Sequence, residues 1–290
     1  MNHLTPLHHS LIQVGLGVLA SLMLVGSAAA NCSRTLQVPI LPSGLTVIVQ
    51  GTNYSGIVPD FLTQVARKAG CKISYQLVPK SRQENMFENA QADLLITAVK
   101  TARRDQFGVF VPLVQLRASL VSIEHGQPAV QSLKDLMQNP SLKLAVVRGF
   151  DYGPVYQSIV DDMQKSGRLQ IENDTISIAR MMRNNTNYVT IMAPTIFAGA
   201  IQTERKLHDL GGRIRYEKLE ELPWTESGIY ISNRSLNESD KNLLKATMDK
   251  LASSESVWKA YQQYYSIDVI KLGLRPREAP LPQPEVHATR

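Results

Sequence analysis

Residues 56–99 read GIVPDFLTQVARKAGCKISYQLVPKSRQENMFENAQADLLITAV, and this stretch decides the fold class. Its first part carries apolar residues at helical spacing, with Ile57, Phe61 and Val65 on one face, and Gly70 ends the helix. The elements predicted next are a strand at 73–79, a helix over 82–91 and a buried strand at 93–99. Strands that alternate with helices are typical of an α/β fold with a mainly parallel sheet.

The same alternation restarts further along the chain. A second opening strand is predicted at 142–149, and helices and strands follow it to residue 220. A late strand at 226–232 and two helices, over 239–254 and 255–265, complete the pattern. Two similar α/β units predict a two-lobed protein, and ligands in such folds lie outside the carboxyl ends of the strands.

The N-terminal segment has the character of an export sequence. Residues 11–30 form an apolar run that ends in three alanines, although no Lys or Arg precedes it. We therefore predict a signal peptide over 1–30, cleavage before Asn31 and a periplasmic protein. A membrane anchor that is retained is the alternative.

The two cysteines of the chain, Cys32 and Cys71, each directly precede a strand-like run. If these strands are parallel neighbours joined by the intervening helix, both cysteines lie at one edge of the sheet, within bridging distance. Export permits a disulfide there, and we predict one. Two free buried thiols are the alternative.

Charge and motifs exclude several function classes. The chain is 43% hydrophobic and 19% charged, with a formal net charge of +6, and its cations are scattered rather than gathered in a stripe. Export and the lack of a basic stripe exclude a nucleic-acid partner. The sequence contains no Walker loop, G-x-S-x-G, H-E-x-x-H or paired C-x-x-C motif, so no cofactor, metal or catalytic site is predicted.

Polar and aromatic residues follow three of the predicted strands. Because the strand ends face one cleft, cations and helix N-terminal amides there predict a site for an anion. The candidates are Thr97, Val99, Thr101 and Arg104 in the first group, Lys80 and Arg82 in the second, and Arg148, Gly149, Phe150 and Tyr152 in the third.

The first unit resembles the bacterial extracellular solute-binding proteins of the polar amino-acid type (family 3). The resemblance rests on GIVPDFLTQVARKAG, on QLVPKSRQENMFENAQADLLITAVKTARRDQFGVFVP, on LAVVRGFDYG and on the terminal WKAYQQYY. It covers most of residues 34–265 in order. It implies two lobes joined by two crossover strands, closing around a small solute.

The resemblance also implies a division of the chain and a role for two residues. Lobe 1 would comprise 31–122 and 223–265, lobe 2 would comprise 123–222, and residues 266–290 would be a proline-rich disordered tail. Thr101 and Arg104 match the family's threonine-x-x-arginine pair, which grips the carboxylate of the ligand. We predict a monomer that is not an enzyme and that works with an inner-membrane ABC permease.

Three departures from the family pattern change the expected ligand. Met192 stands where amino-acid binders carry an aspartate for the ammonium group, Tyr54 is the one aromatic residue in its loop, and Lys80 replaces a tryptophan. A site with cations and without that acid disfavours a free ammonium. We therefore expect a carboxylate or another small anion, contacted by Tyr54, Phe150 or Tyr152.

Two other functions stay open on the same scaffold. One is a dehydratase-like or lyase-like enzyme, for which Asp151 or Glu226 would supply the acid or base. The other is a sensor that binds a ligand without a transporter.

Overall fold

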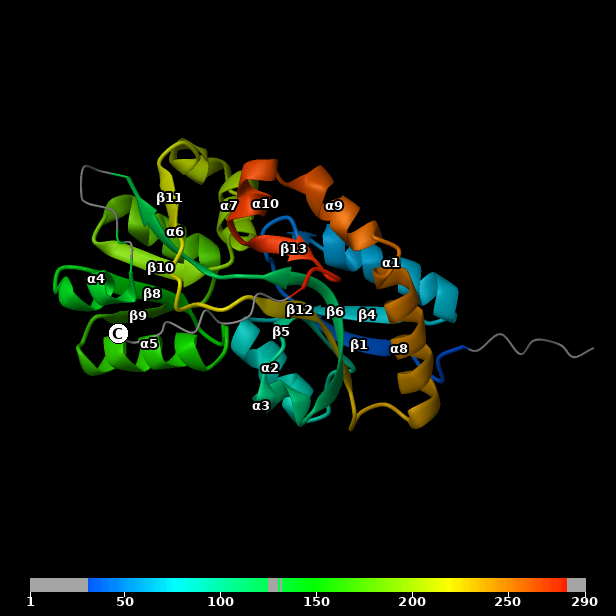
Figure 1. Ribbon diagram of the computed structural model, residues 1–290. Helices are drawn as coiled ribbons and strands as arrows, with labels where there is room; N and C mark the ends of the chain where they lie inside the picture. The colour runs from blue at the N-terminus through cyan, green and yellow to red at the C-terminus, as the bar shows by residue number, and fades with distance from the viewer. Residues whose placement is uncertain (1–30, 125–129, 131, 281–290) are drawn as a thin grey trace, which may run out of the picture.

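Two lobes lie side by side in the computed structural model, which describes residues 31–124, 130 and 132–280 (Figure 1). Each lobe combines sheets with flanking helices, so the predicted two-lobed α/β fold is confirmed. The predicted signal peptide lies outside the described residues. None of the described helices is long and apolar enough to cross a membrane.

The first lobe contains three small sheets. Strands β1 (Leu36–Ile40) and β4 (Ile73–Leu77) form a parallel pair, and β2 (Ile48–Gln50) and β3 (Asn53–Ser55) form a hairpin. The third sheet has four antiparallel strands in the order β13 (Leu274–Pro276), β6 (Gly108–Leu116), β12 (Thr225–Ser232), β5 (Leu94–Val99).

The parallel pair confirms the predicted disulfide. Leu36 lies opposite Ile73 in the β1–β4 register, which brings the preceding cysteines to the same edge. Cys32 and Cys71 are bonded there, with their Cα atoms 4.8 Å apart. The bond closes a loop that contains all of α1 (Ile57–Ala69).

The second lobe is built on one five-stranded sheet. Its order is β11 (Ile214–Glu217), β7 (Ser119–Ile123), β10 (Tyr188–Met192), β8 (Lys143–Val147), β9 (Leu169–Glu172). The pairs β10–β8 and β8–β9 are parallel, whereas β7 pairs antiparallel with both of its neighbours.

Helices complete both lobes. The first lobe carries α1, α2 (Lys80–Glu88), the single turn α3 (Ala102–Asp105), α8 (Glu238–Ala252), α9 (Ser256–Tyr264) and α10 (Ile267–Gly273). The second lobe carries α4 (Leu133–Gln138), α5 (Pro154–Lys165), α6 (Thr175–Asn184), α7 (Pro194–Thr203) and a 3-10 helix (Arg205–Leu210).

The structure corrects three expectations. The four-stranded sheet of the first lobe is antiparallel rather than mainly parallel, because β12 returns late in the chain and inserts between β5 and β6. The expected boundary at residue 122 falls inside β7, which belongs to the sheet of the second lobe. The expected tail is ordered over most of residues 266–280, which form α10 and β13; residues 281–290 lie outside the described residues.

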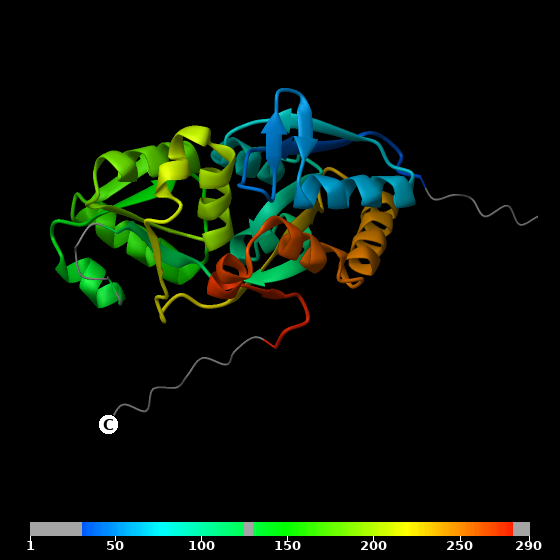
Figure 2. The same ribbon diagram turned by 90° about the horizontal axis from the view of Figure 1, so that it is seen from above.

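The C-terminal segment lies where the two lobes meet (Figure 2). Strand β13 pairs with β6 of the first lobe, while α10 packs against α7 of the second. The two chain crossovers, at 117–118 and 218–224, run close to the same segment: Arg117 donates its backbone N–H to the carbonyl of Gly273, 3.0 Å away.

Candidate functional site

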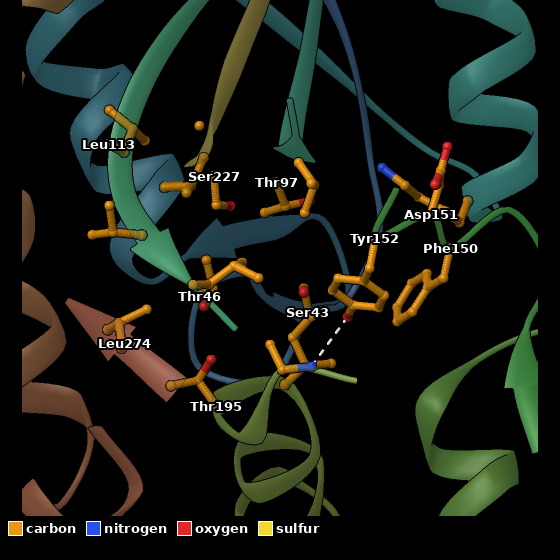
Figure 3. Close-up of a pocket in the computed structure, with 18 of the residues that line it drawn as sticks. Ser43, Thr46, Thr97, Leu113, Phe150, Asp151, Tyr152, Thr195, Ser227 and Leu274 are labelled. Atoms are coloured by element: carbon orange, nitrogen blue, oxygen red, sulfur yellow. Dashed lines mark hydrogen bonds between the residues drawn. The ribbon is translucent and has the colours of Figure 1, made fainter. Parts of the chain in front are cut away.

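A pocket lies between the lobes, at the strand ends that the sequence predicts (Figure 3). The first lobe supplies most of its wall, and the loop after β8 and the start of α7 supply the rest. The residues that line it are Leu41, Ser43, Thr46, Val58, Lys80, Thr97, Val99, Arg104, Leu113, Val114, Leu116, Phe150, Asp151, Tyr152, Ala193, Thr195, Ile196, Ser227, Gly228, Tyr261 and Leu274.

Arg104 is buried in the pocket wall and is held by a carboxylate. Its Nε donates to Glu84 Oε2 at 3.1 Å and its Nη2 donates to Glu84 Oε1 at 2.9 Å. Its Nη1 donates to the carbonyl of Val99 at 2.7 Å. A guanidinium has five N–H groups, so one N–H on each Nη atom has no hydrogen bond to a described residue. Arg104 therefore keeps one N–H on Nη1 and one on Nη2 that can donate to a ligand.

Lys80 shares the same carboxylate. Its Nζ lies 3.0 Å from Glu84 Oε1 and donates to Gln83 Oε1 at 2.7 Å. The side chain is 4% exposed and that of Glu84 is 7% exposed, so both charges are held away from water. Two cations thus share one carboxylate in the wall.

The charges of the cluster shift one another's protonation. Burial opposes the ionised form of Glu84, but the adjacent Lys80 and Arg104 outweigh it and bring the pKa of Glu84 below its ordinary value. Burial lowers the pKa of Lys80, because the attraction of Glu84 only partly offsets the loss of solvation. The charge of Asp151, across the pocket, acts weakly in the same direction as Glu84 and favours the charged lysine.

Thr97 sits in a strained position at the pocket. It has φ of +50° in β5, a conformation that is an outlier for a β-branched residue. The register between β5 and β12 shifts here, so that two residues of β5, Ile96 and Thr97, lie opposite Ile229 alone. On the facing strand, a Cβ at Gly228 would collide with the backbone of Val111. Backbone strain of this kind is concentrated at binding sites.

The second lobe contributes an aromatic edge and an acid. Tyr152 accepts a hydrogen bond from the backbone N–H of Ala193 at 3.2 Å, and burial raises the pKa of its phenol (Figure 3). Phe150 packs edge-on against Tyr152, with ring centroids 6.1 Å apart. Asp151 lines the pocket between them and accepts the backbone N–H of Gly153 at 2.8 Å.

Six of the predicted site residues lie together in this pocket: Lys80, Thr97, Val99, Arg104, Phe150 and Tyr152. Thr101 lies just behind it, where its Oγ1 caps α3 by accepting the backbone N–H of Arg104 at 3.3 Å. Gly149 does not line the pocket. It lies close against the first lobe instead: a Cβ at Gly149 would be 2.9 Å from the backbone nitrogen of Ser81.

The other predicted contacts are placed elsewhere. Tyr54 lies in the β2–β3 hairpin and packs on Tyr75, with centroids 5.1 Å apart. Met192 is fully buried in the core of the second lobe. Arg82 and Arg148 are exposed and do not line the pocket. Glu226, the other acid considered for catalysis, faces Lys100 at 3.4 Å.

Several pocket residues escaped the sequence analysis. Ser43, Thr46, Thr195 and Ser227 add hydroxyl groups, and Glu84 holds both cations. Glu84 comes four residues after Lys80, and α2 begins at Lys80, two residues before the predicted helix, so this spacing places both side chains on one face. Among residues 31–124 and 132–280, no group of three His, Cys, Asp or Glu side chains could hold a metal ion.

No protein-family model and no curated protein sequence matches the chain. Solved structures do. ArgBP from T. maritima, as its P235GK mutant, superposes with a TM-score of 0.64 at 12% identity, over 80% of this chain and 95% of that chain. The chain has the two-lobed fold of periplasmic binding proteins.

Two further structures share this periplasmic-binding-protein fold. AbpA from Streptococcus pneumoniae, the substrate-binding protein of an amino acid ABC transporter, bound to L-arginine, gives a TM-score of 0.63 at 15% identity, over 79% of this chain and 94% of that chain. A histidine kinase sensor domain with similarity to periplasmic binding proteins gives 0.63 at 12% identity, over 80% and 96%.

Proposed function

We propose that the protein is an exported solute-binding protein that closes its lobes on a small carboxylate-bearing solute. The observation that carries this proposal is Arg104, buried in the pocket wall and held by Glu84, with one N–H on each Nη atom that makes no hydrogen bond to a described residue. Two parallel N–H donors are the geometry that binds a carboxylate with both oxygens. Lys80 is a second cation at this wall and lies 3.0 Å from the same carboxylate.

The rest of the lining suits the remainder of a small solute. Hydroxyl groups of Ser43, Thr46, Thr97, Thr195 and Ser227 can donate or accept hydrogen bonds. Asp151 supplies an acid from the second lobe, a position that differs from Met192, where the family places its aspartate. It can accept a hydrogen bond from a donor group on the solute once the lobes enclose it.

The fold supports uptake as the setting. Structures with this fold include the substrate-binding protein of an amino acid ABC transporter, and we propose that this chain likewise serves as a monomer for an inner-membrane permease. A sensor role is the competing proposal, because a histidine kinase sensor domain shares the fold equally well. Growth on a bound solute after deletion of the gene separates the two, because uptake requires the protein and sensing does not.

A test of the carboxylate site measures thermal unfolding with succinate, hexanoate and L-glutamate, and with succinamide and hexanamide as uncharged controls. We expect at least one carboxylate to raise the unfolding temperature while its amide does not. Arg104→Met combined with Glu84→Gln removes both charges of this pair, and Lys80 keeps its hydrogen bond to Gln83; we expect this double variant to abolish the shift, and its unfolding temperature without ligand checks that it is folded. Arg103→Met is the matched control, because Arg103 pairs with Glu88 on the surface and does not line the pocket.

Three results would each contradict a different part of the proposal. A shift that survives in the Arg104 double variant would refute the assignment of the carboxylate to Arg104. A shift by the amides equal to that by the acids would refute an anionic solute. Chemical turnover of a bound acid, lost in Asp151→Asn, would instead show an enzyme.

A further inference from the structure

A second pocket opens beside the first. Strand ends and loops of both lobes line it, and seven of its ten lining residues are apolar. The first lobe contributes Leu41, Pro42, Leu77, Val78 and Pro79, and the second contributes Val147, Phe150, Asn173, Asp174 and Thr175. No lysine or arginine is among them, so this second pocket differs in chemistry from the first.

The one carboxylate in the second pocket, that of Asp174, is already hydrogen-bonded within the protein. Asp174 caps α6: its Oδ1 accepts the backbone N–H of Ser177 at 2.7 Å, and its Oδ2 accepts the hydroxyl at 3.1 Å. A charged or strongly polar ligand group would therefore lose its hydration here without gaining an ionic partner. The surface suits an apolar group.

Leu77 marks the outer part of this pocket. It ends β4 with 52% of its surface exposed, although it is flanked by the buried Val78. Among the described residues only one other large apolar side chain is as exposed: Ile267, at 53%, which lines neither pocket. An apolar ligand group beside Leu77 would remove apolar surface from water, which is favourable.

The two pockets share a wall. Leu41 and Phe150 line both, one from each lobe. Phe150 stands at the edge of the first pocket beside Tyr152 (Figure 3). A molecule anchored at Arg104 would pass between Leu41 and Phe150 to reach Leu77, and it would contact both lobes along the way.

We propose that the solute is an amphiphilic monocarboxylate, an alkyl or aryl acid, whose apolar body passes Leu41 and Phe150 and occupies the second pocket. This inference rests on the proposed function, since the carboxylate at Arg104 fixes the direction of the body. It selects acids with a long apolar chain over small polar acids.

The experiment titrates the protein with acetate, butanoate, hexanoate and octanoate by calorimetry, with succinate as a polar acid. We expect one molecule bound per chain, and a dissociation constant that falls about fourfold per added methylene group once the chain enters the second pocket. Leu77→Ser should weaken octanoate and leave butanoate unchanged. Ile267→Ser is the matched control, because it removes an equally exposed apolar side chain away from both pockets.

The two proposals fail in different ways. If succinate or acetate binds as tightly as octanoate, or if Leu77→Ser binds octanoate as the unaltered protein does, the second pocket is not a ligand site and the carboxylate site stands. If no acid of any length binds, the proposed function fails and this inference fails with it. A dissociation constant that depends on chain length equally in the Leu77 and Ile267 variants would place the chain elsewhere and overturn the inference.

Discussion

At the scale of single residues, Glu84 and Arg104 hold each other through two hydrogen bonds in the pocket wall, so the loss of either partner leaves a buried charge. Removing one member of a buried pair costs far more than breaking a surface pair. Glu84 thus positions the guanidinium, and one N–H on each Nη atom of Arg104 remains for the solute that we propose. Lys80 depends on the same carboxylate.

Glu84→Gln should destabilise the protein by about 3 kcal/mol at neutral pH, because it leaves Lys80 and Arg104 facing each other without their carboxylate. Glu88→Gln is the matched control: Glu88 lies one turn further along α2 and pairs with the exposed Arg103 at 2.5 Å. It should cost less than about 1 kcal/mol. Urea unfolding of both variants measures the difference.

The pH dependence of that difference checks its cause. The pKa of Glu84 is lower in the folded state, so the unfolded state binds the proton more readily as the pH falls. Its stabilising effect is complete above the ordinary glutamate pKa of about 4.3 and is lost as the pH falls through the lower folded value. The difference in the free energy of unfolding between the unaltered protein and Glu84→Gln should therefore narrow below about pH 4. A difference that stays constant down to pH 3 would refute the ionic account.

Residue pairs were the least predictable part of the site. Six of the predicted site residues line one pocket, as their places after strands suggest, but no local pattern points from Arg104 to its partner, because Glu84 lies twenty positions away on another element. Tyr54 and Met192 were expected at the ligand by resemblance. In the structure, Tyr54 of the β2–β3 hairpin packs on Tyr75, and Met192 is buried in the sheet of the second lobe. Both placements depend on contacts with distant residues, so the local sequence does not predict them.

At the scale of elements, α10 and β13 form a strap across the hinge, defined here as residues 267–276. The strap pairs with β6 and packs on α7. It also contacts the second crossover, where the guanidinium of Arg275 lies 3.9 Å from the centroid of the Trp224 ring. The strap therefore touches both crossovers and both lobes. The proline-rich segment that begins at its end, residues 276–290, led to the expectation of a disordered tail, whereas the strap gains order by pairing with β6, far away in the chain.

Gly273→Ala tests how closely the strap is packed. A Cβ at Gly273 would lie 2.5 Å from the carbonyl oxygen of Arg117 and 2.9 Å from Pro194 Cδ, so the backbone would have to move. We expect a loss of about 1–3 kcal/mol, typical of overpacking. Gly212→Ala is the control, since nothing lies within 4 Å of its Cβ position. Equal unfolding midpoints for the two variants would show that the strap does not pack tightly on the hinge.

At the scale of the whole molecule, the lobes meet closely at two places beside the pocket. Gly199 of α7 approaches Gly44 of the first lobe so closely that a Cβ on Gly199 would lie 2.6 Å from the Cα of Gly44. Gly149 meets the backbone of Ser81 in the same manner. The alternation of strands and helices predicted the two lobes correctly, but contacts between them depend on how the lobes dock, which no periodicity records.

Native mass spectrometry of the purified protein, incubated with a mixed extract of small molecules and followed by identification of what it holds, tests the central claim most directly. We predict one bound molecule per chain, a carboxylic acid with an apolar body, that is absent from the variant combining Arg104→Met with Glu84→Gln and present in Arg103→Met. A bound molecule without a carboxylate, binding that persists in the double variant, or no bound molecule at all would contradict the account.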